Sequence, residues 1–144
     1  ITVARRMTRV QLIEGQQRAK YLSSTFIPDQ GQRAPLIRDT IRSQDLENLR
    51  IALENFYANN ISQFPDEIPT NYERELCKFD APSCGDYVDL RPLIPSYILS
   101  IPTDPLAPLD KNGTGYFVRR DKAGALILTA PYSERGFVVE VREE

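Results

Sequence analysis

The chain has 144 residues, of which 41% are hydrophobic and 26% are charged, and its formal net charge at pH 7 is −2. A chain of this length buries about two thirds of its unfolded surface, so it can fold without a metal or a disulfide. The absence of histidine excludes Ser–His and Cys–His nucleophilic sites and removes the commonest metal ligand. The net charge gives no general case for nucleic acid binding. No run of about 18 apolar residues, as a membrane span requires, occurs in the sequence.

Charge is distributed unevenly along the chain. Residues 1–50 hold nine Arg or Lys and five Asp or Glu, a net charge of +4, whereas residues 51–144 hold nine and fifteen, a net charge of −6. The basic part could therefore meet an acidic surface, including the C-terminal part of another copy. The simpler interpretation is that its arginines solvate a helix.

Residues 1–27 have apolar positions at loosely helical spacing, which predicts a helix: Val3, Met7, Val10 and Ile13. Gly15 weakens this helix by about 1 kcal/mol relative to alanine, so we expect it to need partners. The turn-forming residues Pro28-Asp29-Gln30-Gly31 then predict a break over residues 28–34. The first segment, residues 1–34, is therefore interpreted as a helical stem or assembly segment.

Residues 35–60 predict one long amphipathic helix. Its apolar residues recur mostly in steps of three and four, the period of one helix face: Ile37, Ile41, Leu46, Leu49, Leu53, Phe56 and Tyr57. Pro35 suits a first helical turn, and Asp39 is placed near the positive end of the helix dipole. We expect this apolar face to form the core of a globular domain over residues 35–144.

The polar residues of this helix complete the prediction. Glu47 and Arg50, and Arg50 and Glu54, are spaced for weak ion pairs on the solvent face. Asn59-Asn60 makes a plausible end, because asparagine tolerates the left-handed conformation that helix ends often need.

Residues 61–114 are rich in loops and contain the only two cysteines, Cys77 and Cys84. We expect them to form a disulfide, because they leave no third thiol and lie in a polar, turn-rich segment. Such a bond implies an oxidising compartment. The alternative is a pair of free thiols in a reducing cytosol.

The C-terminal part predicts a small antiparallel sheet of three or four strands. A short helical turn is expected within residues 87–95, and proline-rich and glycine-rich turns over 100–105 and 110–115. Three strands follow, at residues 116–120, 125–130 and 137–141, with Asp121-Lys122-Ala123-Gly124 as the hairpin loop. Because such a sheet has one face that needs cover, the long helix is expected to pack on it in an α+β fold.

No catalytic site is predicted, since the carboxylates form no compelling pair, and no cofactor is expected. Asp110, Asn112 and Thr114 alternate as in some calcium loops, and Asp104 could join them from the neighbouring turn. An ordinary turn is favoured, so we expect no metal. Asn60 and Asn112 begin weak matches to the N-glycosylation triplet.

The order of these parts resembles the type IV pilin and type II secretion pseudopilin superfamily. Residues 37–60 look like the exposed half of the pilin stem helix, residues 87–108 with their IPTDP turn look like the segment entering the sheet, and residues 115–134 look like the closing hairpin. Leu12-Ile13-Glu14 is similar to the sequence near the mature start of family members, where the glutamate meets a neighbouring N-terminal amine. Family members carry a strongly apolar helix there, whereas this segment is basic and polar.

The resemblance implies a structural, non-enzymatic subunit of a pilus-like filament at the cell surface or in the periplasm. Partners would be further copies of this chain, together with other pilin-like subunits, and a membrane would be involved only for a precursor. We expect the N-terminal helix to mediate assembly through Val3, Val10, Ile13, Glu14, Leu22, Phe26 and Ile27. The alternative is a soluble minor pseudopilin or surface binding module that does not polymerise.

Overall fold

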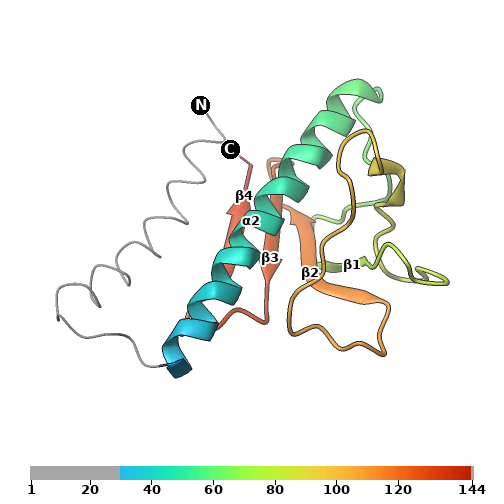
Figure 1. Cartoon of the computed structure of the whole chain (residues 1–144). Helices are drawn as coiled ribbons and strands as arrows, with labels where there is room; N and C mark the ends of the chain where they lie inside the picture. Colours follow the sequence, from blue (N-terminus) through green and yellow to red (C-terminus); the bar gives the residue numbers. More distant parts are fainter. Residues whose placement is uncertain (1–29, 144) are drawn as a thin grey trace.

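The computed structural model describes residues 30–143. One long helix, α2 (Gln30–Asn59), packs on a four-stranded antiparallel sheet, which confirms the predicted α+β class (Figure 1). The helix predicted over residues 1–27 and the predicted assembly residues lie outside the described residues. Within residues 30–143, no helix is both long and apolar enough to cross a membrane.

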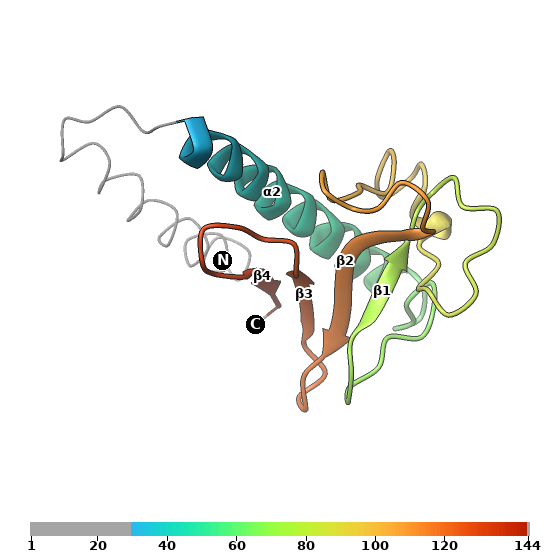
Figure 2. The same cartoon turned by 90° about the horizontal axis from the view of Figure 1, so that it is seen from below.

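The sheet consists of β1 (Arg74–Cys77), β2 (Gly113–Arg120), β3 (Leu126–Ala130) and β4 (Val139–Arg142). The strands lie side by side in chain order, and each pair is antiparallel. Figure 2 shows α2 covering one face of this sheet. The three predicted strands are present, although β2 begins three residues earlier and β4 two residues later than expected.

The sheet has four strands, within the predicted three or four, but the place of β1 was not predicted, because it lies in the segment interpreted as loop. Its four residues include only two apolar ones, too few for a clear alternating pattern. Tertiary contacts supply the pairing instead. β1 is hydrogen bonded to β2 on one side, and on the other Val88 N donates to Glu75 O and Cys77 N donates to Val88 O, each at 2.9 Å.

The core lies between α2 and the sheet. Leu46, Leu49 and Leu53 of the helix are fully buried, as predicted. In the sheet, the paired residues Val118, Leu128 and Val141 are buried across three neighbouring strands. Side chains alternate between the two faces of a strand, so one row of each strand reaches the helix.

The predicted helix break is wrong for residues 30–34. Helix α2 includes them, and Pro35 lies inside it rather than in its first turn. Glycine in a helix is a penalty of about 1 kcal/mol rather than a block, and an interior proline, which removes one hydrogen bond and crowds the preceding turn, costs about 3 kcal/mol. Turn-forming residues therefore did not suffice to end the helix. Residues 28 and 29 lie outside the described residues.

The predicted apolar face is wrong at its N-terminal end and also at Tyr57, which is 38% exposed. Ile37 is 54% exposed and Ile41 is 39% exposed, whereas Asp39, which lies between them, and Arg42, which follows them, are fully buried. At this level of the helix, the side facing the protein is occupied by ion pairs. The pattern of apolar residues alone could not distinguish the two sides.

Helix α2 ends where predicted, but Asn59 and Asn60 are not the residues in the left-handed conformation. The left-handed residues are Ile61 and Ser62, with φ angles of 55° and 54°. Asn60 instead uses its side chain, whose Nδ2 donates to Phe56 O at 2.8 Å. This bond satisfies one of the carbonyls that every helix end leaves open.

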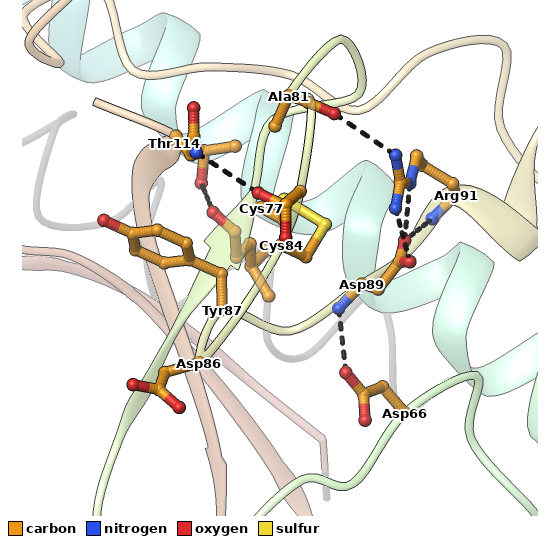
Figure 3. Close-up of a disulfide and its surroundings, with 12 residues drawn as sticks. Asp66, Cys77, Ala81, Cys84, Asp86, Tyr87, Asp89, Arg91 and Thr114 are labelled. Carbon is orange, nitrogen blue, oxygen red and sulfur yellow. Dashed lines mark hydrogen bonds and ion pairs between the residues drawn. A yellow bond between two sulfur atoms is a disulfide. The ribbon is translucent and has the colours of Figure 1, made fainter. Parts of the chain in front are cut away.

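The predicted disulfide between Cys77 and Cys84 is present, with the two Cα atoms 5.6 Å apart (Figure 3). It closes a loop beside β1. The expected short helical turn follows as η1 (Arg91–Leu93). Arg91 binds both carboxylate oxygens of Asp89 and donates to Ala81 O at 3.3 Å, which ties η1 to the disulfide loop.

We expect Leu49→Ala to lower the free energy of unfolding by about 2–5 kcal/mol, because it leaves a cavity between helix and sheet. The matched change on the exposed side, Ile37→Ala, should alter it by no more than about 0.5 kcal/mol. Urea unfolding of dilute protein measures both. Equal losses in the two variants would contradict the assigned orientation of α2.

Candidate assembly face

The outward side of α2 carries a continuous row of eight exposed residues, which we term the α2 seam. They are Ala34, Ile37, Ile41, Gln44, Asn48, Ile51, Asn55 and Ala58. Between Ala34 and Phe56, every exposed residue of the helix belongs to this row.

The spacing of the α2 seam is regular. Its members are separated alternately by three and four residues, the spacing of the a and d positions of a coiled coil. None of the eight residues is charged, although solvent-exposed helix faces are ordinarily rich in charge. A row of this length spans about 36 Å at 1.5 Å per residue. The arrangement is suited to packing against another helix.

A groove of about 440 Å³ runs along one side of the α2 seam. Asn48 and Ile51 of the helix line one wall, and residues 97–100 together with Pro102 line the other. Leu99 on this second wall is almost fully exposed. The apolar surface of the seam therefore continues sideways onto the loop that precedes the IPTDP turn.

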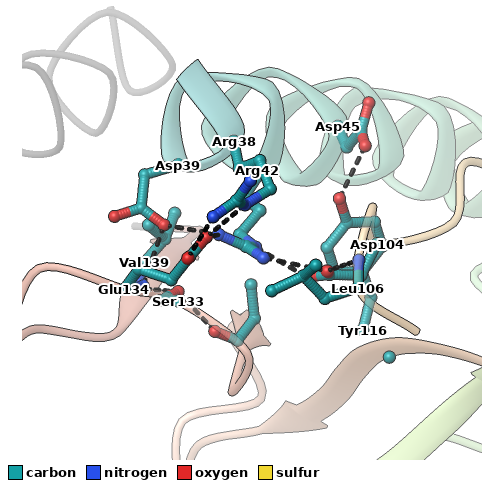
Figure 4. A network of polar contacts seen from close by, with 12 residues as sticks. Arg38, Asp39, Arg42, Asp45, Asp104, Leu106, Tyr116, Ser133, Glu134 and Val139 are labelled. Atoms are coloured by element: carbon teal, nitrogen blue, oxygen red, sulfur yellow. Dashed lines mark hydrogen bonds and ion pairs between the residues drawn. The ribbon is translucent and has the colours of Figure 1, made fainter. Parts of the chain in front are cut away.

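A buried cluster of ion pairs lies on the opposite side of α2 (Figure 4). We term it the ion-pair cluster; it contains Arg38, Asp39, Arg42, Asp104, Glu134 and Arg135. Three positive and three negative side chains balance within it. The cluster joins the helix to the IPTDP turn and to the loop between β3 and β4.

Arg42 is the centre of the ion-pair cluster and is fully buried. Its Nε and Nη2 donate to the two oxygens of Asp104 at 2.7 and 3.0 Å. Its Nη1 donates to Asp39 and to Glu134, each at 2.8 Å. Burial acts to lower the pKa of Arg42, but these hydrogen bonds outweigh it and raise the pKa. Arg42 therefore stays charged and holds α2 in one rotation about its axis.

The Glu134 carboxylate accepts hydrogen bonds from Arg38 as well as from Arg42. Arg38 Nε and Nη2 donate to its two oxygens at 2.7 and 2.6 Å. These bonds, followed by the bond from Arg42, lower the pKa of Glu134 to about 2, although partial burial acts in the opposite direction. The Glu134 backbone N also donates to Asp39 Oδ1 at 3.0 Å.

Asp45 makes a second link between helix and sheet. Tyr116 Oη donates to Asp45 Oδ2 at 2.6 Å, as Figure 4 shows. Burial raises the pKa of Asp45, and the Tyr116 hydrogen bond offsets part of that rise. Burial and the bond to Asp45 both raise the pKa of Tyr116.

The two ion pairs predicted on the solvent face of the helix are present, but they are not solvated. Arg50 is fully buried, and Glu47 is also buried. Arg50 binds Glu47 and Glu54, at the predicted spacings of three and four residues. These charges lie beside the α2 seam rather than on it, which leaves the exposed row uncharged.

Two of the residues weighed for a calcium loop, Asp104 and Thr114, make other hydrogen bonds. Asp104 N donates to Thr114 O at 2.8 Å, so the two turns do meet. However, both Asp104 oxygens are bound to Arg42, and Thr114 Oγ1 donates to Leu76 O at 3.0 Å. Among residues 30–143, no group of three Cys, Asp or Glu side chains could hold a metal ion.

The two candidate glycosylation residues are partly buried and hydrogen bonded. Asn60 Nδ2 also donates to Tyr97 Oη at 3.3 Å, and Asn112 Nδ2 donates to Ser83 O at 3.2 Å. A glycan on either nitrogen would have to replace these bonds. Glycosylation of Asn60 and Asn112 stays a prediction.

Comparison with models of known families, with curated proteins and with solved structures found no match for this chain. The resemblance noted in the sequence rests on three stretches of residues. In the structure, residues 37–60 lie in α2 and its end, residues 87–108 contain η1 and the IPTDP turn, and residues 115–134 contain the β2–β3 hairpin.

Sequence reasoning missed the α2 seam, although its residues were visible. Ile37 and Ile41 belong both to the predicted core face and to the exposed row, so the two patterns overlap. Charge would have separated the two rows in the wrong sense, because charged residues are ordinarily placed in solvent. The exposed row contains no charged residue, whereas the row through Asp39, Arg42 and Arg50 does, and that row is buried.

The lowered pKa of Glu134 predicts a loss of stability in acid. The pKa is about 2 in the fold against an ordinary value of 4.5, so the unfolded chain binds the proton first as the pH falls. This carboxylate therefore stabilises the fold above pH 4.5, and that stabilisation disappears between pH 4.5 and pH 2.

Glu134→Gln should therefore lower stability at pH 7 and flatten the dependence of stability on pH between 4.5 and 2. Glu67→Gln, on an exposed loop, is the matched control and should leave the slope unchanged. Urea unfolding at several pH values measures the slope. An identical acid profile for Glu134→Gln and the wild type would show that the pair is not formed.

Proposed function

We propose that this chain is a structural subunit of a type IV pilus-like filament at the cell surface or in the periplasm. The observation that carries the proposal is the α2 seam, an exposed and uncharged row with the spacing of a helix–helix interface. Further copies of the chain would pack helices against this row. The role is structural rather than enzymatic.

The fold gives the seam the properties that such a subunit needs. Ordering a helix on assembly opposes binding, because conformational entropy is lost. Here α2 is already held by the core and by the ion-pair cluster, so its outward row is presented in a fixed orientation. A disulfide such as Cys77–Cys84 suits a subunit that works in an oxidising compartment.

In the proposed filament, the N-terminal segment supplies the other half of each contact. Residues 1–27 carry five Arg or Lys and one Glu, a net charge of +4. Asp45, Glu47 and Glu54 border the C-terminal half of the α2 seam, but Glu47 and Glu54 are already paired with Arg50. Screened surface charges contribute little individually, and apolar packing onto the isoleucines should dominate.

A second candidate is a soluble minor subunit or binding module, favoured by the groove beside Ile51. Such a protein would accept one partner along the groove and the seam without forming a fibre. The two functions differ in whether the wild-type chain polymerises.

We expect the full chain to form thin, uniform fibres, and Ile41→Glu to reduce the pelleted filament mass about tenfold or more, because the interface would bury an unpaired carboxylate. Leu109→Glu, at a position that is 98% exposed and far from the helix in sequence, should assemble normally. Negative-stain electron microscopy and sedimentation measure the yield.

Thermal unfolding of both variants checks that the fold is intact. A normal filament yield from Ile41→Glu would refute the role of the α2 seam. A wild-type chain that stays dispersed at every concentration would refute the filament and favour the binding module.

A further inference from the structure

The α2 seam is complementary to itself. We propose that the dispersed subunit forms a parallel, two-fold symmetric dimer in which the α2 seams of two copies pair in register as a short coiled coil. The inference rests on the proposed role of the seam as a helix-docking face, and it names the partner of that face before assembly.

The register follows from the positions of the three isoleucines. In a parallel pair in register, each seam residue lies opposite the same residue of the second copy. Ile37, Ile41 and Ile51 then each face isoleucine. Sliding one helix by a heptad would place Ile37 opposite Gln44, Ile41 opposite Asn48 and Ile51 opposite Ala58. The in-register pair is thus the arrangement that matches apolar with apolar residues.

An antiparallel pair matches fewer residues. Antiparallel coiled coils place a positions opposite d positions, and the best register brings Ile41 opposite Ile51 of the second copy. Ile37 would then face Asn55 of that copy, so one apolar layer in each half becomes mixed. The parallel pair retains all three isoleucine layers.

The polar members of the seam also favour two parallel strands. With Ile37 and Ile51 at d positions, Ile41 and Asn48 occupy a positions. Isoleucine at both a and d positions by itself favours coils of more than two strands, whereas asparagine at an a position fixes register and oligomer state while lowering stability, so Asn48 is the residue that argues for two strands. Asn48 would pair with Asn48 of the second copy. We therefore expect a specific but weak dimer.

The flanking charges permit this arrangement along most of its length. In a parallel coil, a residue at g lies beside the residue five positions later on the second helix. Glu47 then falls at the level of Ala52 of the second copy, both being buried within their own subunits, and Glu54 meets Asn59 of that copy, so the acidic residues do not face one another. The one like-charged contact, Arg33 with Arg38 of the second copy, is moderated because Arg38 is already paired with Glu134.

The fold compensates for the short length of the seam. Isolated helices of this size are marginal in water, and two asparagine layers weaken the coil further. Helix α2, however, is formed and oriented in the monomer by the core and the ion-pair cluster. Pairing therefore needs to align two existing helices rather than fold them.

Engineered cysteines at the two ends of the seam test the orientation. Ala34→Cys and Ala58→Cys, each alone, should give a disulfide-linked dimer of the full chain under mild oxidation, because identical residues lie opposite each other. The two variants mixed should give no product linking residue 34 to residue 58, since these ends are about 36 Å apart in the parallel pair. Mass spectrometry of the linked peptides identifies each product.

The opposite pattern, in which only the mixture forms a 34–58 link, would establish an antiparallel pair and overturn the proposal. No link in any sample, with monomeric sedimentation at all concentrations, would overturn it as well. Ile41→Glu should raise the dissociation constant of the dimer about 100-fold or more, because two carboxylates would face each other in the interface. Leu109→Glu should leave the dissociation constant unchanged. Loss of the dimer in that variant would speak against the α2 seam as the interface.

The measurement separates this inference from the proposed function. Cross-linking is read on the fraction that remains in solution after high-speed sedimentation, so it does not require filaments. Cross-links of the parallel pattern in a chain that forms no fibres would refute the filament proposal and support the dimer. If the chain forms fibres but its dispersed fraction is monomeric and gives no cross-links, the dimer proposal is refuted and the filament proposal is supported.

Discussion

The buried charge of Arg42 is the constraint on which the arrangement of this protein depends. Removing one partner from a buried ion pair leaves an uncompensated charge at a cost of about 3–5 kcal/mol. Arg42 avoids that cost only when Asp104 and Glu134 approach α2 from two different loops. The helix therefore has one favourable rotation and one favourable position along its axis.

This rotation decides what the helix shows to solvent. When Asp39 and Arg42 face the protein, Ile37 and Ile41 must face outward, since residues about two positions apart lie on opposite sides of a helix. The polar cluster thus exposes apolar residues. An inverted arrangement would bury the isoleucines and leave a conventional charged surface, with no row suited to another helix.

The same contacts connect the outward face to distant parts of the chain. Asp104 belongs to the IPTDP turn and Glu134 to the loop between β3 and β4, and both reach the helix through arginine. The ion-pair cluster has no net charge when its three carboxylates are ionised. The stability that it gives the fold therefore depends on those carboxylates remaining ionised. Because Glu134 has a pKa of about 2, its own pairs with Arg38 and Arg42 persist until the solution is strongly acidic.

The sequence by itself determined the long helix, its buried leucines at positions 46, 49 and 53, the three C-terminal strands and the disulfide. These features depend on local spacing, turn chemistry and the number of cysteines, which a single chain displays directly. Only the tertiary structure decided that β1 pairs with β2, that Arg42 and Arg50 are buried, and that the isoleucines form an exposed row. Charged residues are ordinarily placed in solvent, and that rule fails where partners from residues far apart in the sequence surround the charge.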